Sequence, residues 1–481
     1  MRLSELLAPW QSVPADADRD VAGLALDSRA LRPGDAFVAL PGRRGHGLAH
    51  LDEALAAGAV AVLTEPGEAP AAPVPVVPVP GLRGRLGELA ARLYGHPAEA
   101  LPVIGVTGTN GKTSVAAFLA QALAVDGPVG HLGTLGQGLW GRLEATRHTT
   151  PDVLSVHRRL AQARDAGAVA AVMEVSSHAL DQGRVDGVRF ATAVFTQLGR
   201  DHLDYHGDLA AYGAAKARLF RTPGLGAAVL NLDDPFAAAL VSDAPRWGYR
   251  LGAPSGAREV GAEGLRCDAG GLAFDLLHGG RRAPVATGLL GRFQVHNLLA
   301  AATALLTLGH ELDEVARRLS RVQAPPGRME PYRAPGRPLV VVDYAHTPDA
   351  LAAALDSLRA HVRGRLWCVF GAGGERDRGK RPLMARAAEA RADALVLTDD
   401  NPRGEAPEAI VADLRAGLSG AVPVTVVHDR GEAIAHALAQ AAPEDAVLVA
   451  GKGHEDYQEI AGTRRSHSDR ETVARLLGVA S

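Results

Sequence analysis

A glycine-rich segment that ends in Gly-Lys-Thr has the residue types that bind the phosphates of a nucleotide. It runs from Thr107 to Thr113 (TGTNGKT), between an apolar run, Val103–Val106, that predicts a strand and a stretch to about Val125 that predicts a helix. In such a loop backbone N–H groups bind anionic oxygens, Lys112 reaches the β- and γ-phosphates, and the Thr113 hydroxyl binds Mg²⁺. Val106 stands where the usual pattern has its first glycine, so this loop is a variant. We expect a site for ATP and Mg²⁺; a glycine-rich turn without a nucleotide is the alternative.

Two further segments follow predicted strands and carry groups that suit a metal ion or an anion. Glu174 follows the apolar run Val169–Met173, where its carboxylate is placed to complete the Mg²⁺ shell begun by Thr113. Arg200–Gly207 holds two histidines and two aspartates, including His202, at spacings that match no closed zinc site. Taken alone, Glu174 is better interpreted as a solvated residue at a strand end.

Lysine is scarce, and most of the lysines fall in these motifs. Of 51 Lys and Arg residues only four are lysine, namely Lys112, Lys216, Lys380 and Lys452. A lysine kept in so arginine-rich a chain is expected to do what a guanidinium cannot, such as act as a point charge or lose its proton. Lys216, inside the predicted helix Leu209–Phe220, is therefore a candidate, with an ordinary helical lysine as the alternative.

From about Pro338 onward, predicted strands alternate strictly with predicted helices. These elements must position a second set of polar loops. Apolar runs predict strands at 339–343, 366–370, 394–398, 423–427 and 446–450, with helical stretches between them. This pattern predicts a doubly wound α/β domain with a mainly parallel sheet. Polar loops follow the strands, and the carboxyl ends of parallel strands share one edge, where open α/β sheets bind ligands. The loops are Asp343–His346, Gly371–Asp377, Asp399–Arg403, His428–Arg430 and Gly451–Glu455.

The N-terminal region predicts a smaller α/β unit. Ala36–Leu40 and Val60–Thr64 predict strands, Leu51–Ala57 a helix, and residues 81–94 another helix. The repeated prolines from Pro73 to Pro80 favour an extended edge or connector.

Composition bounds the class of protein. A chain of 481 residues is too long for one core, and 47% apolar with 22% charged residues is typical of a folded, soluble protein. A net charge of −3 gives no basic field for nucleic acid or an anionic membrane. Two distant cysteines fit a reducing compartment. No signal peptide and no membrane-spanning run is evident, so we expect a cytoplasmic protein, and a monomer.

Together the motifs resemble those of the Mur ligases, and they span nearly the whole chain. The matching segments are Thr107–Thr113, Thr149–Pro151, Glu174–Leu180, Asp201–Gly207, Ala215–Phe220, Gly291–Asn297, Gly327–Glu330, Asp343–Pro348, Gly379–Met384, Asp400–Arg403 and Gly451–Gln458.

The resemblance implies an α/β fold of three domains. They are a UDP-substrate-binding domain at 1–97, a central P-loop ATPase domain at 98–331, and a Rossmann-like amino-acid-binding domain at 332–481. It also implies a reaction in peptidoglycan precursor synthesis: ATP phosphorylates the D-Glu side-chain carboxylate of UDP-MurNAc-L-Ala-D-Glu, and an amine displaces the phosphate. The branch of the family that the chain resembles adds meso-diaminopimelate.

The resemblance further implies roles for single residues at the nucleotide. The catalytic residues are Lys112, Glu174, His202 and Lys216, and Lys216 matches a lysine that the family carbamylates. The metal-binding residues are Thr113, Glu174, His202 and Lys216. The ATP-binding residues are Gly108, Thr109, Asn110, Gly111, Lys112, Thr113, Asn297, Arg328 and Asp343.

Two other sets are implied for the remaining substrates. Those expected to hold the UDP-muramoyl dipeptide are Leu26, Ser28, Thr149, Thr150, Ser176, Gln182 and Arg184. Those expected to hold diaminopimelate are Arg376, Asp400, Asn401, Pro402, Arg403, Gly451 and Glu455. Arg403 would fork onto the distal carboxylate that lysine lacks, and Glu455 would pair with the distal ammonium. If Arg403 were only a solvated turn residue, L-lysine would be the alternative substrate.

Some positions depart from the family pattern. Gln197, Gly199 and Glu375 replace residues that are often Asn, Ser and Asp, and His148 precedes the Thr149-Thr150 pair where Asn is frequent. Other Mur-type or folylpolyglutamate-type ligases are the next alternative, although the Asp-Asn-Pro-Arg and Gly-Lys-Gly-His-Glu segments argue against them. A nucleotide-binding switch is a third, but it would not need the loops of a separate domain.

Overall fold

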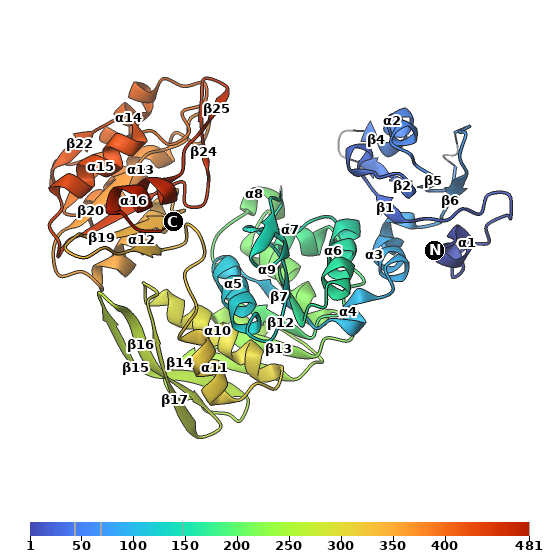
Figure 1. The fold of residues 1–481 in the computed structure, drawn as a ribbon, viewed down its shortest axis with the longest axis horizontal. Helices are drawn as coiled ribbons and strands as arrows, with labels where there is room; N and C mark the ends of the chain where they lie inside the picture. Colours follow the sequence, from blue (N-terminus) through green and yellow to red (C-terminus); the bar gives the residue numbers. More distant parts are fainter. Residues whose placement is uncertain (43–44, 68–69, 147, 481) are drawn as a thin grey trace. The chain divides into compact units, whose positions relative to one another are not determined.

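The computed structural model describes residues 1–42, 45–67, 70–146 and 148–480, which divide into two compact units, Met1–Trp247 and Gly248–Ser481. Each unit is an α/β structure (Figure 1). Within the described ranges, no helix is both long and apolar enough to cross a membrane.

The N-terminal part of the first unit contains a four-stranded parallel sheet in the order β1-β2-β5-β6. The proline-rich stretch supplies only the edge strand β6, as predicted, because proline has no N–H to donate to a neighbouring strand. The elements are α1 (Leu3–Leu7), β1 (Gly23–Ala25), β2 (Asp35–Ala39), β3 (Pro41–Gly42), β4 (Gly45–His46), α2 (Leu51–Ala56), β5 (Ala61–Thr64), β6 (Val76–Pro78) and α3 (Leu82–Leu93).

The rest of the first unit has strands in the order β10-β9-β8-β11-β7-β12-β13, and β7 is paired in parallel with both β11 and β12. β7 is buried along its whole length, as expected for a strand in the middle of a parallel sheet. The elements are α4 (Pro97–Ala100), β7 (Val103–Thr107), α5 (Lys112–Leu123), β8 (Val129–Gly133), β9 (Gly136–Leu139), β10 (Arg142–Glu144), α6 (Val153–Asp165), β11 (Ala170–Glu174), α7 (Ser177–Asp181), β12 (Thr192–Phe195), α8 (Leu203–His206), α9 (Leu209–Ala217) and β13 (Ala227–Asn231).

Strand order reverses around β7 in this sheet. The chain leaves β7 for β8 on one side, returns to β11 beside β7, and then crosses to β12 on the other side. In open α/β sheets, ligands bind outside the carboxyl ends of the strands at such a switch point. The loop Thr107–Lys112, Glu174 and the segment after Phe195 all lie at those ends.

The second unit contains antiparallel strands that were not predicted from the sequence. β15 pairs with β16 and β16 with β17 through tight connections at Ala269-Gly270 and Gly279-Gly280. The elements up to the C-terminal sheet are β14 (Arg246–Leu251, which begins just before the unit boundary), β15 (Glu259–Asp268), β16 (Gly271–His278), β17 (Arg281–Thr287), α10 (Phe293–Thr307) and α11 (Leu312–Leu319).

The C-terminal sheet has the order β18-β19-β23-β20-β21-β22, and all its pairs are parallel except β18 with β19. The five predicted strands are confirmed, with β21 and β22 slightly shorter than expected. The elements are β18 (Glu330–Tyr332), β19 (Leu339–Asp343), α12 (Pro348–Arg359), β20 (Leu366–Phe370), α13 (Lys380–Glu389), β21 (Ala394–Leu397), α14 (Pro407–Arg415), β22 (Val424–Val426), α15 (Arg430–Gln440), β23 (Ala446–Ala450), β24 (Tyr457–Ile460), β25 (Thr463–Ser466) and α16 (Asp469–Leu477).

Helices cover both faces of this sheet. Apolar residues of α12, α13 and α14 form one buried cluster with one face of the strands, and those of α15 and α16 form another with the opposite face. Strands covered on both faces are apolar at every position, which explains the continuous runs in the sequence. The doubly wound prediction is therefore confirmed, and the strand-end loops share one edge.

Candidate active site

The phosphate loop has the strand–loop–helix geometry that the sequence predicts. It connects β7 to α5, and Gly108 and Gly111 have φ values of +150° and +87°, which residues with a Cβ rarely adopt. Lys112 folds back over the loop, where its Nζ donates to the carbonyls of Gly108 at 2.8 Å and Thr109 at 3.1 Å. The N-terminus of a 12-residue helix and a lysine therefore meet at one loop, a combination suited to bind an anion.

The segment that directly follows the neighbouring strand β12 holds this loop in place. Thr109 N donates to the carbonyl of Gln197 at 2.8 Å, and the Thr196 hydroxyl donates to the carbonyl of Asn110 at 2.6 Å. The Thr109 hydroxyl also accepts from Gly199 N at 2.8 Å. Gln197 and Gly199, which depart from the family pattern, thus act here through backbone groups, and the side-chain change leaves these contacts intact.

Glu174 is fully buried at the end of β11 and faces the loop. Its Oε2 accepts the Thr113 hydroxyl at 2.8 Å, and its Oε1 accepts Thr134 N at 2.6 Å. The sequence-based reading missed Thr134, although it directly follows β8, at the same sheet edge. A buried carboxylate next to a hydroxyl is a set of hard oxygen ligands, so these residues fit Mg²⁺.

Lys216 is brought to the same loop from α9. Its side chain is 1% exposed, its Nζ donates to the carbonyl of Gly108 at 3.0 Å, and it lies 4.1 Å from the centre of the Tyr212 ring. Burial, with the nearby Lys112 charge, lowers the pKa of Lys216 to about 6. The amine is therefore mostly neutral at neutral pH and can act as a nucleophile.

His202 is placed differently from the other three predicted metal-binding residues. It is about half exposed, and it packs edge-on against His178 at 4.8 Å and Tyr212 at 6.2 Å between ring centres. Among the described residues, no three His, Cys, Asp or Glu side chains form a group able to hold a metal ion.

Most residues expected at the UDP-muramoyl dipeptide form one connected network. The Thr150 hydroxyl donates to the carbonyl of Glu174 at 2.8 Å, and it also accepts from Ser176 N at 3.1 Å. Arg184 donates to the carbonyl of Thr150 at 2.9 Å and to Gln182 Oε1 at 2.6 Å. Thr149 joins through its hydroxyl, 3.2 Å from that of Thr134.

Leu26 and Ser28 belong to the N-terminal sheet region and not to that network. The buried Ser28 hydroxyl donates to Glu53 Oε2 at 2.8 Å, and Ser28 opens a short 3₁₀ helix, Ser28–Ala30, while Leu26 is half-buried just before it. No hydrogen bond described in the structure connects these two residues to Thr150 or Arg184. Their assignment to the same substrate stays a prediction.

The second unit contains the other residues expected at the nucleotide. Asp343, at the end of β19, accepts Met329 N at 2.7 Å and Ala345 N at 2.9 Å, and burial raises its pKa despite these bonds. The Arg328 guanidinium lies 4.8 Å from the centre of the Tyr344 ring. Asn297, 6% exposed in α10, donates to Gln294 Oε1 at 2.8 Å. The structure links Arg328 with the β19 loop but shows no such link for Asn297.

Two arginines of the strand-end loops approach one glycine. A Cβ placed on Gly373 would lie 3.0 Å from Arg403 Nη1 and 3.8 Å from Arg376 Cγ. Arg403 adopts φ +54°, and its Nη1 donates to the carbonyl of Gly374 at 2.7 Å, so it is a positioned residue and not a freely solvated one. Pro402 packs its carbonyl against Gly374.

The remaining members of this set lie beside them. Asn401 is 4% exposed, and its Nδ2 donates to Glu455 Oε2 at 3.2 Å. A Cβ on Gly451 would lie 2.6 Å from Asp400 Oδ2, so this glycine permits the close approach of the two loops. The strand-end loops therefore carry both arginines and carboxylates, charges that complement a group with a carboxylate and an ammonium.

Comparison with known proteins identifies the class to which this fold and site belong. Three family models match: "Mur ligase family, catalytic domain" over residues 20–94, "Mur ligase middle domain" over 106–305, and "Mur ligase, glutamate ligase domain" over 327–453. The chain belongs to the Mur ligase family, with its three-domain architecture of N-terminal, central ATPase-type and C-terminal domains. The exact boundaries at residues 97 and 331 stay predictions.

Individual relatives are similar over almost their whole length. The UDP-N-acetylmuramoyl-L-alanyl-D-glutamate–2,6-diaminopimelate ligase of Alkalilimnicola ehrlichii is 53% identical, covering 99% of both chains. The ligase of the same name from Pseudomonas aeruginosa is 52% identical over 96% of both. A solved structure of a protein with that name has a TM-score of 0.74 and 38% identity over 99% of each chain.

Proposed function

We propose that the chain is an ATP-dependent ligase that adds meso-2,6-diaminopimelate to UDP-MurNAc-L-Ala-D-Glu in peptidoglycan precursor synthesis. The full-length similarity to ligases of that name supports the proposal. The observation that carries the choice of amino acid is the position of Arg403, whose guanidinium is held at the carbonyl of Gly374, together with a Glu455 that accepts a hydrogen bond from Asn401. A cytoplasmic location and a monomeric state stay predictions from the sequence.

The reaction needs ATP because a carboxylate and an ammonium do not condense in water. A D-Glu side-chain oxygen attacks the γ-phosphorus, which gives an acyl phosphate and ADP. The deprotonated amine then attacks the acyl carbon, the amide bond forms, and inorganic phosphate leaves with the C–O electron pair. The protein's contribution is positioning and neutralisation of charge on the transferred phosphoryl group.

The phosphate loop supplies the first part of that contribution. The backbone N–H groups at the start of α5 and the Lys112 ammonium bind the phosphates, while Thr113 and Glu174 are the residues that would hold Mg²⁺. A bound Mg²⁺ would offset the charge of the phosphate oxygens. Lys216, buried beside Gly108, has an amine that can add carbon dioxide and so become a carbamate, a further anionic ligand.

The strand-end loops of the second unit bind the amino acid that carries the attacking amine. Arginine forms bidentate pairs with carboxylates, so Arg403 and Arg376 suit the distal carboxylate, and Glu455 suits the distal ammonium. L-Lysine has no distal carboxylate and could not form such a pair with either guanidinium group. The site therefore favours diaminopimelate over lysine.

The test is phosphate release from ATP in the presence of UDP-MurNAc-L-Ala-D-Glu, with meso-diaminopimelate or L-lysine added in parallel. We expect release with diaminopimelate, and little with lysine. Release with lysine alone would keep the class of ligase and refute the assignment of Arg403. No stimulation by either amino acid would refute the proposed reaction.

A further inference from the structure

The side chain of Lys452 is fully buried, yet none of the roles proposed above uses it. It directly follows Gly451, in the loop that leaves β23. Its Nζ donates to Asn401 Oδ1 at 3.0 Å and to the carbonyl of Tyr457 at 2.6 Å, and it forms an ion pair with Glu455 Oε2 at 3.4 Å. An ammonium has three donors, and here each has an acceptor. A buried charged group whose donors all have acceptors is held in one position.

The three acceptors come from three segments around the proposed amino-acid site. Asn401 lies in the loop after β21, Glu455 in the loop after β23, and Tyr457 is the first residue of the hairpin β24–β25. The hairpin is bound to the Asn401 loop as well, because Asn401 Oδ1 accepts Glu459 N at 2.9 Å and Arg403 N donates to the carbonyl of Glu459 at 2.9 Å. Lys452 therefore ties together the segments that carry Asn401, Arg403 and Glu455.

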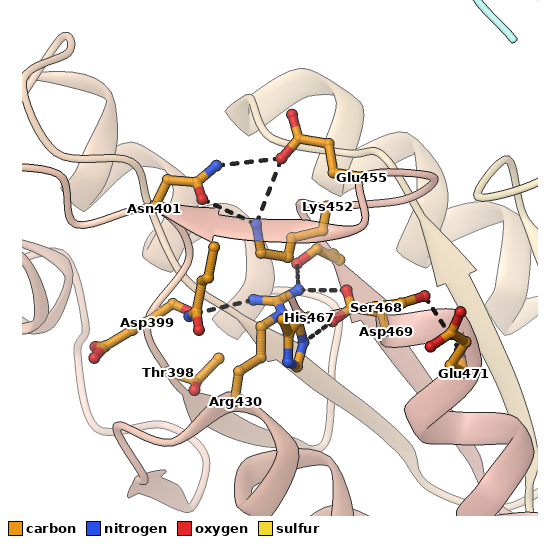
Figure 2. Close-up of polar contacts among 12 residues, drawn as sticks. Thr398, Asp399, Asn401, Arg430, Lys452, Glu455, His467, Ser468, Asp469 and Glu471 are labelled. Atoms are coloured by element: carbon orange, nitrogen blue, oxygen red, sulfur yellow. Dashed lines mark hydrogen bonds and ion pairs between the residues drawn. The ribbon is translucent and has the colours of Figure 1, made fainter. Parts of the chain in front are cut away.

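The contacts of the Glu455 carboxylate involve only one of its two oxygens among the described residues. Its Oε2 receives both Lys452 Nζ and Asn401 Nδ2, at 3.4 and 3.2 Å, while among the described residues no hydrogen bond reaches Oε1. Figure 2 shows one carboxylate oxygen facing Lys452 and Asn401 and the other turned away from both. One oxygen is thus fixed by the protein, and the other is left to accept a hydrogen bond from a ligand.

A buried arginine and aspartate support this arrangement from below. Arg430 pairs with Asp469 through two contacts of 2.7 Å (Figure 2), and both side chains are fully buried. Arg430 Nη2 also donates to the carbonyl of Ala450, two residues before Lys452. The end of β23 is therefore held by one ion pair and its loop by another.

We propose that Lys452 is a positioning residue for the amino-acid substrate, which fixes Glu455 so that its Oε1 accepts the distal ammonium of diaminopimelate. The inference rests on the proposed function. Lys452 touches no reacting atom; it acts through Glu455 and, to a smaller extent, through Asn401. It should therefore govern recognition of the distal amine and leave the handling of ATP and of the UDP substrate unchanged.

The test compares two amino acids in wild-type enzyme and in Lys452→Met, which keeps an apolar stem of similar length and removes the charge. One amino acid is meso-diaminopimelate, and the other is 2-aminopimelate, which keeps the distal carboxylate but lacks the distal amine. In Lys452→Met we expect KM for diaminopimelate to rise about 10- to 100-fold, the range for a lost charge-assisted hydrogen bond. KM for ATP and UDP-MurNAc-L-Ala-D-Glu should change less than about threefold, and KM for 2-aminopimelate should rise far less than KM for diaminopimelate, so the preference for the distal amine is lost.

A double-mutant cycle tests whether Lys452 acts through Glu455. Glu455→Gln should raise KM for diaminopimelate by a similar factor, and Lys452→Met combined with Glu455→Gln should be no worse than Glu455→Gln alone. Additive effects of the two changes would refute the inference. Val473→Ala, in the buried core cluster beside α15, is the matched control: it should lower the melting temperature without altering the preference for the distal amine.

The outcomes separate the two proposals. If wild-type enzyme is not stimulated by diaminopimelate, both the proposed function and this inference fail. If wild-type enzyme uses diaminopimelate and prefers it to 2-aminopimelate, but Lys452→Met keeps that preference, only the role of Lys452 is refuted. Should Lys452→Met not fold, Lys452→Gln, which keeps a donor without the charge, is measured in the same way.

Discussion

Lys216 is the residue whose chemistry depends most on its surroundings. It is buried, and its Nζ lies between the carbonyl of Gly108 and the ring of Tyr212. An amine with a pKa of about 6 gains its neutral form as the pH rises past 6, and only the neutral form adds carbon dioxide. Arginine cannot replace it, because a guanidinium does not lose its proton in proteins.

For Lys216→Ala we expect kcat to fall about 100-fold or more, which is the effect of removing an electrostatic group aimed at developing charge. A short carboxylate such as formate or acetate should partly restore activity, because it can occupy the space of the missing carbamate. Lys216→Arg should be inactive and should not be rescued. The measurement is steady-state phosphate release with and without the added carboxylate, and full activity in Lys216→Ala would refute the carbamate role.

Asp469 makes the second unit sensitive to acid. Burial alone would raise the pKa of Asp469, but the ion pair with Arg430 outweighs burial and holds this pKa below its usual value. A carboxylate with a lowered folded-state pKa stabilises the fold above its unfolded-state pKa, and that stability is lost as the pH falls below about 4. Breaking a buried ion pair by removing one partner typically costs about 3–5 kcal/mol.

We therefore expect Asp469→Asn to lower the free energy of unfolding at pH 7 by about 3–5 kcal/mol and to flatten its dependence on pH below about 4. Denaturant unfolding followed across that pH range measures both effects. Asp313→Asn, on α11, removes an exposed ion pair with Arg281 of β17; it is the control and should change stability by about 1 kcal/mol or less. An unchanged acid dependence in Asp469→Asn would contradict the assignment.

At the scale of elements, the phosphate loop depends on one glycine. Gly108 has φ +150°, and a Cβ there would lie 1.8 Å from the Thr196 hydroxyl oxygen, which itself donates to the carbonyl of Asn110. Gly108→Ala would therefore force β12 and the loop apart. We expect ATP affinity to fall at least about tenfold, together with a loss of stability of about 1–3 kcal/mol.

Gly84→Ala provides the matched comparison for that prediction. Gly84 lies in helix α3, and a Cβ there would meet no atom within 4 Å. Alanine should stabilise the helix by about 0.5–1 kcal/mol and leave ATP binding unchanged. Calorimetric titration with ATP and thermal unfolding measure both variants. If Gly108→Ala bound ATP as tightly as Gly84→Ala, the loop geometry would not be what controls binding.

The elements that could be predicted from sequence are those whose signal is local. Continuous apolar runs indicated the parallel strands β7, β11 and β12, and Gly-Lys-Thr indicated the loop between β7 and α5, because buried parallel strands and phosphate loops have characteristic residues. The antiparallel strands β15 and β16 were missed, although Ala269-Gly270 is a turn signal between them. Their alternating exposure gives no apolar run of the kind that marked the others.

The site residues that escaped prediction are those defined by contacts between distant segments. Thr134 is an ordinary threonine in sequence, and only the pairing of β8 with β11 brings its N–H to Glu174. Lys452 was noticed for its rarity, but its role depends on the docking of the hairpin β24–β25 onto the Asn401 loop. Such contacts are set by tertiary packing, which a motif in a single sequence does not contain.

At the scale of the whole molecule, the chemistry divides between the two compact units. Lys112, Glu174 and Lys216 belong to Met1–Trp247, while Arg403 and Glu455 belong to Gly248–Ser481. An acyl phosphate reacts with an amine only at bonding distance, and it is hydrolysed if water reaches it first. A ligase built in this way needs the two bound substrates to be brought together for each turnover, and such closure of domains often limits kcat.

We therefore expect the protein to become more compact when ATP analogue, UDP-MurNAc-L-Ala-D-Glu and diaminopimelate are all bound. Small-angle X-ray scattering should show a smaller radius of gyration with all three ligands than with none, and an intermediate or unchanged value with the amino acid alone. Lys112→Met, which lacks the cation of the phosphate loop, should show no such decrease at the same ligand concentrations because it binds the nucleotide poorly. Identical scattering profiles of the wild-type protein with and without the ligands would contradict closure, and the amine would then have to reach the acyl phosphate within a protein whose two units do not move.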